Sequence, residues 1–486
     1  MRTACLSSFL CGVLGAVVAL PVAAQWSTDP SDNLVLADQP AGQVQPKLVP
    51  TADGGFYTSW FDAGSGYDVY LQRLSADGTE QWPHGGLLVG DRSFSATQDY
   101  GLAIAGDGDA LLAYRSGSDV GAQITASRVA PDGTLLWGPE GVVVSDDPDG
   151  ANSPRIAATS DGDAVVAWSA SDGAVVLQKL DADGNALWGD GVSVVPPAGF
   201  FLLADLRASD DGSVIASWSA QLSFQDRQLW AQKFNGADGA PMWGSEPVAV
   251  FDGTGGAMQF GYFPEFIDDG AGGAVFVWYT VSLSGSVRVQ HVLADGDMAF
   301  VQNGIVLGTD PDLTYTGPAG AYDPASGDIY AIWHFADAAT QGQIGVAAQR
   351  LDAAGVRQWG DEGVVLEPQT ATEQSELGAL ALPGGGVLFS WASDSWPSAM
   401  PVHVTRLDTS GDPVWSAAVV DIKTGPTDTA RLAGALSAYP FAAWVWEDGT
   451  NGGGSGSIKA QAIDFDGMLG GAAGNDTIFS DGFDGP

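Results

Sequence analysis

Few side chains in this chain are spaced for catalysis. Among 486 residues there are 59 Asp+Glu, 18 Lys+Arg and 4 His, so carboxylates are the abundant reactive groups. His84, His291, His334 and His403 lie at least 40 residues apart, and their spacing matches neither a zinc site nor a metalloprotease helix. No Gly-x-Ser-x-Gly turn indicates a serine hydrolase. We therefore assign no catalytic residue and no metal site.

The acidic residues have a structural interpretation. Only nine of the 59 are Glu and 50 are Asp, the residue that favours turns. Stretches such as Asp181-Ala-Asp183-Gly184 could bind calcium through oxygen atoms, but the rest of a calcium loop is missing and a hairpin turn is favoured. We expect no cofactor, with adventitious calcium binding compatible with so many aspartates.

The net charge of −41 limits the possible partners. Nucleic acids and anionic lipid surfaces would be repelled, so neither is expected to bind.

Residues 1–24 have one charge, Arg2, an apolar run from Cys11 to Leu20, and small residues at 22–24, which predicts a secretory signal peptide. Both cysteines lie in this segment, so the remaining chain has no thiolate and no disulfide. No later segment is apolar for long enough to span a membrane. We expect a secreted, periplasmic or cell-envelope protein, and a monomer.

A repeat of about 55 residues dominates the sequence from 25 to 468. Each copy contains two aromatic positions, here called landmarks, and we expect them to pack neighbouring repeats together. Tyr114 and Phe300 take the place of tryptophan once each. The tryptophans are Trp26, Trp60, Trp82, Trp137, Trp168, Trp188, Trp218, Trp243, Trp278, Trp333, Trp359, Trp391, Trp415 and Trp444.

The repeat is split between the two ends of the chain. The last copy ends at Met468 without its second landmark, and Trp26 lies one period before Trp82, followed by the apolar residues 34–36. A closed ring needs such a split, whereas an open solenoid needs polar end caps. We predict that an N-terminal strand completes the last repeat.

Each copy predicts four short strands, a to d, typified by residues 155–158, 164–168, 174–180 and 188–195. Asp-Gly pairs such as Asp161-Gly162 and Asp183-Gly184 separate strands a and b and strands c and d, and predict tight hairpins whose two central residues have positive φ. Eight such units in a closed ring form an all-β, eight-bladed β-propeller of antiparallel blades. Residues 469–486 are expected to be a flexible Gly/Asp-rich tail.

The Leu-Asp-x-x-Gly-x-x-x-Trp pattern, as in Leu180–Trp188 and Leu351–Trp359, resembles the repeats of secreted bacterial β-propellers of unassigned activity. It is similar in layout to eight-bladed quinoprotein-like propellers, whose vicinal cysteine pair this chain lacks. The ending 475–484 resembles a short terminus of exported proteins of Gram-negative bacteria. The resemblance implies architecture and export, and no activity.

Strand c carries a base in most copies: Arg73, Arg128, Lys179, Lys233, Arg350 and Arg406, with His291 in the fifth. These bases could form a belt that attracts an anion. The favoured interpretation is that each pairs with turn aspartates about four residues along the chain.

In an antiparallel blade the a–b and c–d turns share one face of the ring, and the longer b–c and d–a loops share the other. Function concentrates on loops held by a rigid scaffold, so a ligand site is expected on the second face. The candidate binding residues there are aromatic: Phe94, Tyr100, Phe201, Phe224, Tyr262, Phe263, Tyr315 and Trp396.

Three functions remain open at this stage. The leading hypothesis is a secreted, non-enzymatic binding protein that takes a glycan or a polypeptide on the loop face. The alternative is a carbohydrate-active hydrolase or lyase with paired carboxylates on that face, which must converge within about 5 to 10 Å. The third is an envelope assembly scaffold.

Overall fold

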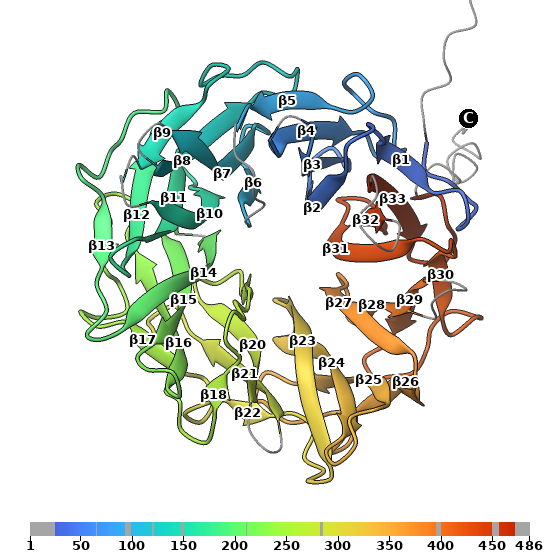
Figure 1. Cartoon of the computed structure of the whole chain (residues 1–486). Helices are drawn as coiled ribbons and strands as arrows, with labels where there is room; N and C mark the ends of the chain where they lie inside the picture. Colours follow the sequence, from blue (N-terminus) through green and yellow to red (C-terminus); the bar gives the residue numbers. More distant parts are fainter. Residues whose placement is uncertain are drawn as a thin grey trace, which may run out of the picture.

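The computed structural model is an eight-bladed β-propeller, with four antiparallel strands in each blade arranged around a central opening (Figure 1). This confirms the predicted fold class. The structure describes residues 25–471 apart from 65, 93–98, 119–120, 146, 148–149, 210, 282–284, 395–399 and 450–455. The predicted signal peptide, most of the predicted tail, Phe94 and Trp396 lie outside these residues. No helix among the described residues has the length and apolarity needed to cross a membrane.

Blades 1 to 7 take their strands in chain order from the inside outward. Blade 1 consists of β2 Gln43–Pro50, β3 Phe56–Asp62, β4 Asp68–Leu74 and β5 Leu87–Gly90, and blade 2 of β6 Gly101–Ile104, β7 Ala110–Ser118, β8 Gly121–Val129 and β9 Val142–Ser145. Blade 3 consists of β10 Ala151–Ala158, β11 Ala164–Ala170, β12 Val175–Leu180 and β13 Val192–Val194, and blade 4 of β14 Phe200–Ala208, β15 Val214–Gln221, β16 Arg227–Phe234 and β17 Val248–Phe251.

Blade 5 contains β18 Ala257–Met258, β19 Phe266–Asp268, β20 Ala274–Val281, β21 Ser286–Val292 and β22 Ile305–Val306. Blades 6 and 7 are β23 Leu313–Asp323, β24 Asp328–Asp337, β25 Ile344–Leu351 and β26 Val364–Thr370; β27 Glu373–Ala381, β28 Val387–Asp394, β29 Val402–Leu407 and β30 Val420–Lys423. Blade 8 combines β31 Asp428–Leu436, β32 Phe441–Gly449 and β33 Ser457–Asp464 with β1 Leu34–Ala37.

The N-terminal strand completes the last blade, as the split repeat predicts. β1 pairs antiparallel with β33, with Leu34 opposite Ala460, so blue and red strands lie side by side in Figure 1. Trp26 donates its backbone N–H to Asp77 and its indole Nε1–H to Ala76 of blade 1, at 3.1 and 2.9 Å. The segment therefore bridges blade 8 and blade 1.

The same contact recurs at every junction between blades. The landmark at the start of strand d packs against a glycine with positive φ in the c–d turn of the next blade. At Trp137, Trp243, Trp359 and Trp415 the indole also donates a hydrogen bond to a carbonyl of that turn. The eight pairs are Trp26–Gly78, Trp82–Gly133, Trp137–Gly184, Trp188–Gly239, Trp243–Gly296, Phe300–Gly355, Trp359–Gly411 and Trp415–Gly467.

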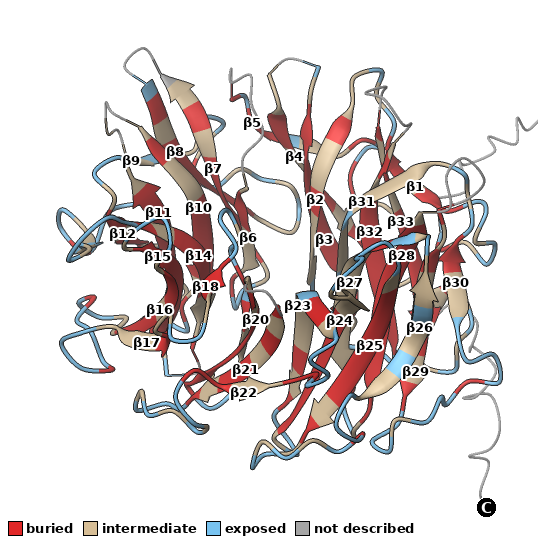
Figure 2. Cartoon of the chain, turned by 60° about the horizontal axis from the view of Figure 1, so that its bottom comes forward, coloured by how far each residue is buried: buried red, intermediate tan, exposed pale blue. Residues whose placement is uncertain are grey.

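The landmarks of strand b fill the layers between blades. Trp60, Trp218, Trp278 and Trp333 have no exposed surface, and the buried residues in Figure 2 follow the strands while the loops are exposed. These indoles supply large apolar area where twisted sheets meet.

The hairpin turns differ from the predicted geometry. In the turn of blade 3 the N–H of Gly162 bonds to Thr159 O at 3.0 Å and the N–H of Thr159 bonds to Asp163 O at 2.9 Å. Gly162 has a φ of 88°, whereas Asp161 is not among the residues with positive φ. The prediction that both central residues have positive φ is therefore wrong. Three residues form the connection, and only the last of them, glycine, takes the left-handed conformation.

Replacing Trp26 by Ala tests the closure of the ring. The indole is 95% buried (5% exposed) and holds two blades together, so we expect a loss of about 3 kcal/mol in the free energy of unfolding, measured by urea titration. The loss should affect one transition of the whole propeller. Asp32→Asn, an exposed change in the same segment, should leave the stability unchanged. Local fraying at the terminus with an unchanged main transition would contradict this closure.

Candidate functional site

The bases of strand c are bound within the turn face and are not free to form an anion belt. Lys179 contacts Asp161 at 2.6 Å and Asp163 at 3.1 Å, and Lys233 contacts Asp211 at 2.8 Å. Both lysines are almost fully buried. Equivalent contacts join Arg73 to Asp53, Arg128 to Asp107 and Asp109, His291 to Asp269, and Arg350 to Asp328.

The sequence predicts that each strand c base pairs with turn aspartates about four residues along the chain, which would place them in the c–d turn. The partner aspartates belong to the a–b turn, which lies beside the base across the hairpin, and not to the c–d turn four residues along. Each base also reaches the next blade: Lys179 Nζ donates to Gly236 O at 3.0 Å and Lys233 Nζ to Gly272 O at 2.8 Å. Among the described residues, Arg406 makes only this second kind of contact, with Phe465 O at 2.6 Å. The belt therefore connects neighbouring blades.

The four histidines lie in separate places. His84 contacts Glu80 at 3.1 Å, His291 contacts Asp269 at 2.8 Å, and His403 contacts Asp421 at 2.7 Å. Across the described ranges, no group of three His, Cys, Asp or Glu side chains is arranged to hold a metal ion.

The central opening is a cavity with a volume of about 900 Å³. Its lining comes from the innermost strands of all eight blades. In blade 5 the innermost strand is interrupted. Met258 pairs with Thr280 and Phe266 with Phe276, so two residues that are eight positions apart in the chain pair with residues of β20 that are only four positions apart. The extra residues form the 259–265 loop, and Tyr262, Phe263 and Glu265 of this loop line the cavity.

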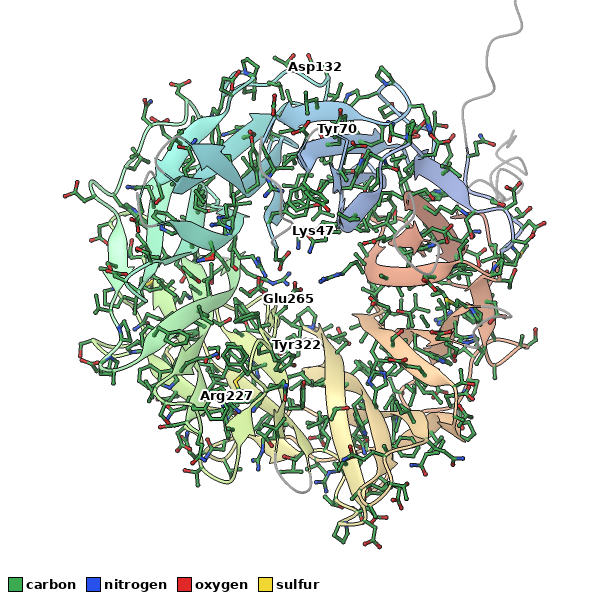
Figure 3. All side chains as sticks on the ribbon, viewed as in Figure 1. Lys47, Tyr70, Asp132, Arg227, Glu265 and Tyr322 are labelled. Atoms are coloured by element: carbon green, nitrogen blue, oxygen red, sulfur yellow. The ribbon has the colours of Figure 1, made fainter. Side chains whose placement is uncertain are left out.

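Charged side chains line the cavity along blades 1 to 5. Lys47 contacts Asp99 at 2.9 Å, and Arg155 joins Asp99 to Asp205. Arg207 contacts Asp205 at 2.7 Å and Glu265 at 3.1 Å. Figure 3 shows Lys47 and Glu265 at the central opening, with Tyr70 and Asp132 farther out. We call this alternating series of Lys47, Asp99, Arg155, Asp205, Arg207 and Glu265 the charged arc.

The ion pairs keep these carboxyls ionised. Burial favours the neutral form of Asp99, but the charges of Lys47 and Arg155 outweigh it and hold the pKa of Asp99 well below its usual range. Burial likewise opposes ionisation of Glu265, and Arg207 is the main charge that lowers its pKa. The Asp205 carboxylate raises the pKa of Arg207. The Asp99 and Glu265 side chains remain 42% and 58% exposed, so both can still accept hydrogen bonds from a ligand.

Blades 6 to 8 line the opposite wall with small residues, which leave the cavity open. This small-residue arc consists of Ala319, Gly320, Gly378, Ala379, Ala433 and Gly434. The cavity thus has one wall rich in donors and acceptors and another made largely of backbone and methyl groups.

The aromatic residues proposed from the sequence lie in different environments. Tyr100, Tyr262 and Phe263 line the cavity, but Tyr100 is fully buried and bonds through its hydroxyl to Gln45 O at 3.0 Å. Phe201 is buried between Trp218 and Trp230. Tyr315 is buried and its hydroxyl donates to Glu362 at 2.7 Å. Phe224 is 85% exposed and lies outside the cavity lining.

The charged arc was not predicted from the sequence. The available signal was a charged residue inside an otherwise apolar innermost strand, six residues before the turn aspartate. Lys47, Arg155 and Asp205 stand in this relation to Asp53, Asp161 and Asp211. The residue types differ between blades, so the repeat pattern does not reveal the position.

No family model matches this chain, and no curated protein matches it. Solved structures match it at low identity. An ulvan lyase bound to GlcA(1-4)Rha3S units has 11% identity and a TM-score of 0.47, covering 91% of this chain and 97% of its own. A protein of unknown function from Dyadobacter fermentans has 11% identity and a TM-score of 0.40, covering 91% and 99%. The SapL1 lectin in complex with alpha methyl fucoside has 9% identity and a TM-score of 0.37, covering 81% and 99%. These values give no basis for transferring an activity.

Asp211→Asn tests the pairing of the belt. The change leaves the buried ammonium of Lys233 without its carboxylate, and we expect the free energy of unfolding to fall by about 1–2 kcal/mol at pH 7. Asp190→Asn, at an exposed aspartate without an ion pair in the described structure, should change it by less than about 0.5 kcal/mol. Equal effects of the two substitutions in urea titration would contradict the assigned pairing.

The burial of His334 should make the folded protein less stable in mild acid. Burial lowers its pKa to about 4, and its Nε2 has no hydrogen-bond partner among the described residues. The fold therefore favours neutral histidine, and stability present above pH 6.5 is lost as the pH falls towards 4. Between pH 7 and pH 4.5 this loss should amount to about 2 kcal/mol.

Urea titrations at both pH values check this expectation. His334→Gln should remove that part of the pH dependence, whereas the control His84→Gln should retain it, because the carboxylates of Glu80 and Asp38 raise the pKa of His84 against the effect of burial. An unchanged pH dependence in His334→Gln would exclude this histidine as the cause.

Proposed function

We propose that this chain is a non-enzymatic, exported glycan-binding propeller whose site is the central cavity at the d–a loop side. The observation that carries the proposal is the charged arc facing an open wall, with Phe263 of the 259–265 loop 37% exposed at the cavity. Export rests on the predicted signal peptide, residues 1–24.

The chemistry of the arc suits a polyhydroxylated ligand. A sugar hydroxyl both donates and accepts a hydrogen bond, and adjacent hydroxyls need a donor and an acceptor close together. Arg207 and Glu265, 3.1 Å apart and both about half exposed, offer this combination on neighbouring blades. Because the side chains already hold one another in place, little conformational entropy is lost on binding.

The carbohydrate-active enzyme is the second candidate. Asp99 and Asp205 both contact Arg155, so carboxylates from different blades do approach one another. A glycosidase also needs one carboxylic acid that is kept protonated, with a raised pKa. The lowered pKa values of Asp99 and Glu265 oppose that requirement and favour binding.

A panel of immobilised oligosaccharides from plant, algal and bacterial polysaccharides tests the proposal, with titration calorimetry on those that bind. Phe263→Ala should weaken binding about tenfold, because it removes an exposed ring from the cavity. Phe224→Ala is the matched control, since this ring is more exposed but lies outside the cavity lining.

Three results would overturn the proposal: no binding to any oligosaccharide, equal effects of the two substitutions, or cleavage of the bound oligosaccharides. Binding of polypeptides alone in a parallel screen would assign the cavity to a protein ligand.

A further inference from the structure

The cavity differs in charge from the rest of the molecule. Acidic residues outnumber basic ones by 59 to 18 in the chain, but the cavity is lined by four bases and four acids. The bases are Lys47, Arg155, Arg207 and Arg431, and the acids are Asp99, Asp205, Glu265 and Asp268. The site is therefore locally balanced within a strongly acidic protein, and an anionic ligand meets less repulsion there than elsewhere.

One of these bases is not used by the charged arc. Lys47, Arg155 and Arg207 share Asp99, Asp205 and Glu265 among them. Arg431 lies on β31 of blade 8, beyond the arc, and its guanidinium makes no ion pair or hydrogen bond with the described residues. Its side chain is exposed within the cavity lining.

The backbone positions Arg431 at the cavity through a β-bulge. The register of β31 against β32 shifts between Ala430 and Ala433, and Arg431 has a φ of 57°, which is unfavourable for a residue with a side chain. Bulges of this kind redirect a side chain. Gln45 and Glu376 occupy the matching bulges of blades 1 and 7, with φ of 55° and 53°.

Two carboxylates at the neighbouring bulges bind backbone N–H groups, and the charge of Arg431 acts on one of them, Glu447, without forming an ion pair. Glu376 Oε2 accepts the N–H of Leu432 at 2.9 Å, and Glu447 Oε2 accepts the N–H of Gln45 at 3.4 Å. Each joins one bulge to the neighbouring blade. Arg431 therefore keeps a five-donor guanidinium, able to form two parallel hydrogen bonds with a carboxylate or sulfate group, directed at an open cavity.

We propose that Arg431 binds an anionic substituent of the sugar, so that the cavity selects acidic over neutral glycans. The inference rests on the proposed glycan-binding function and identifies the class of glycan. The charged arc would bind the sugar hydroxyls, and Arg431, at the end of the small-residue arc, would bind the anionic group. A uronate carboxylate and a sulfate ester both have the required geometry.

The test uses matched oligosaccharides and titration calorimetry. One set contains uronates together with the same oligosaccharides carboxyl-reduced to alcohols, and the other contains sulfated oligosaccharides with their desulfated forms. The wild type should bind acidic members at least tenfold more tightly, and added salt should reduce that preference. The set that shows the preference distinguishes carboxylate from sulfate.

Arg431→Gln should lower the affinity for acidic members about tenfold and leave the affinity for neutral ones unchanged. Arg431→Lys should keep part of the preference, and both variants should melt close to the wild-type temperature, because the Arg431 guanidinium forms no hydrogen bond or ion pair with the described residues. Arg357→Gln, in a c–d turn outside the cavity lining, is the control and should keep the full preference.

Equal wild-type affinity for acidic and neutral members would overturn this inference and leave the glycan-binding function standing. A preference that persists in Arg431→Gln would also overturn it. Failure to bind any member of either set would instead contradict the proposed function.

Discussion

The packing of an aromatic ring on a glycine of the next blade is the contact on which this structure depends. A Cβ at Gly467 would lie 2.9 Å from the ring of Trp415, so only glycine allows this approach. The same glycine has a φ of 88° and completes the c–d turn. One residue thus serves both the hairpin within a blade and the junction between blades. This double requirement explains why the repeat is so regular in its Asp-Gly and Trp positions and so variable elsewhere.

The aromatic–glycine contacts between blades lie on the face of the ring that carries the a–b and c–d turns. On the same face, buried lysines and arginines of strand c add contacts between blades. Because the ring is held there, the innermost strands and the d–a loops are free to differ. Blades 1 to 5 use that freedom to place the charged arc, blade 5 interrupts its inner strand to form the 259–265 loop, and blades 6 to 8 keep small residues. A symmetric scaffold therefore encloses an asymmetric cavity.

The fold could be predicted because its signals repeat. The period, the eight units and the closing N-terminal strand all follow from aromatic spacing, and the position of Trp26 one period ahead of Trp82 is enough to indicate the split repeat. The turn geometry was missed because an Asp-Gly pair is compatible with both two-residue and three-residue hairpins, and the choice depends on backbone hydrogen bonds such as that of Gly162.

The site was harder to predict for the opposite reason. Lys47, Arg155, Asp205 and Glu265 hold equivalent places in their blades but differ in charge, so comparing repeats treats them as variation. Aromatic residues in the predicted loops indicate a binding face, yet several of them, such as Phe201 and Tyr315, pack inside the protein. Distinguishing a buried ring from an exposed one requires the tertiary structure.

Because both ends of the chain contribute strands to blade 8, the ring closes only after most of the chain has been synthesised. β1 is made first, but its partner β33 begins at Ser457, more than 400 residues later. Until then β1 has an unpaired edge, and blade 1 has no blade 8 beside it. Joining ends so far apart costs about 5 kcal/mol of chain entropy, which the pairing of β1 with β33 and the packing of blade 8 on blade 1 must offset. A chain that has not yet reached β33 can therefore form neighbouring blades but cannot close the ring.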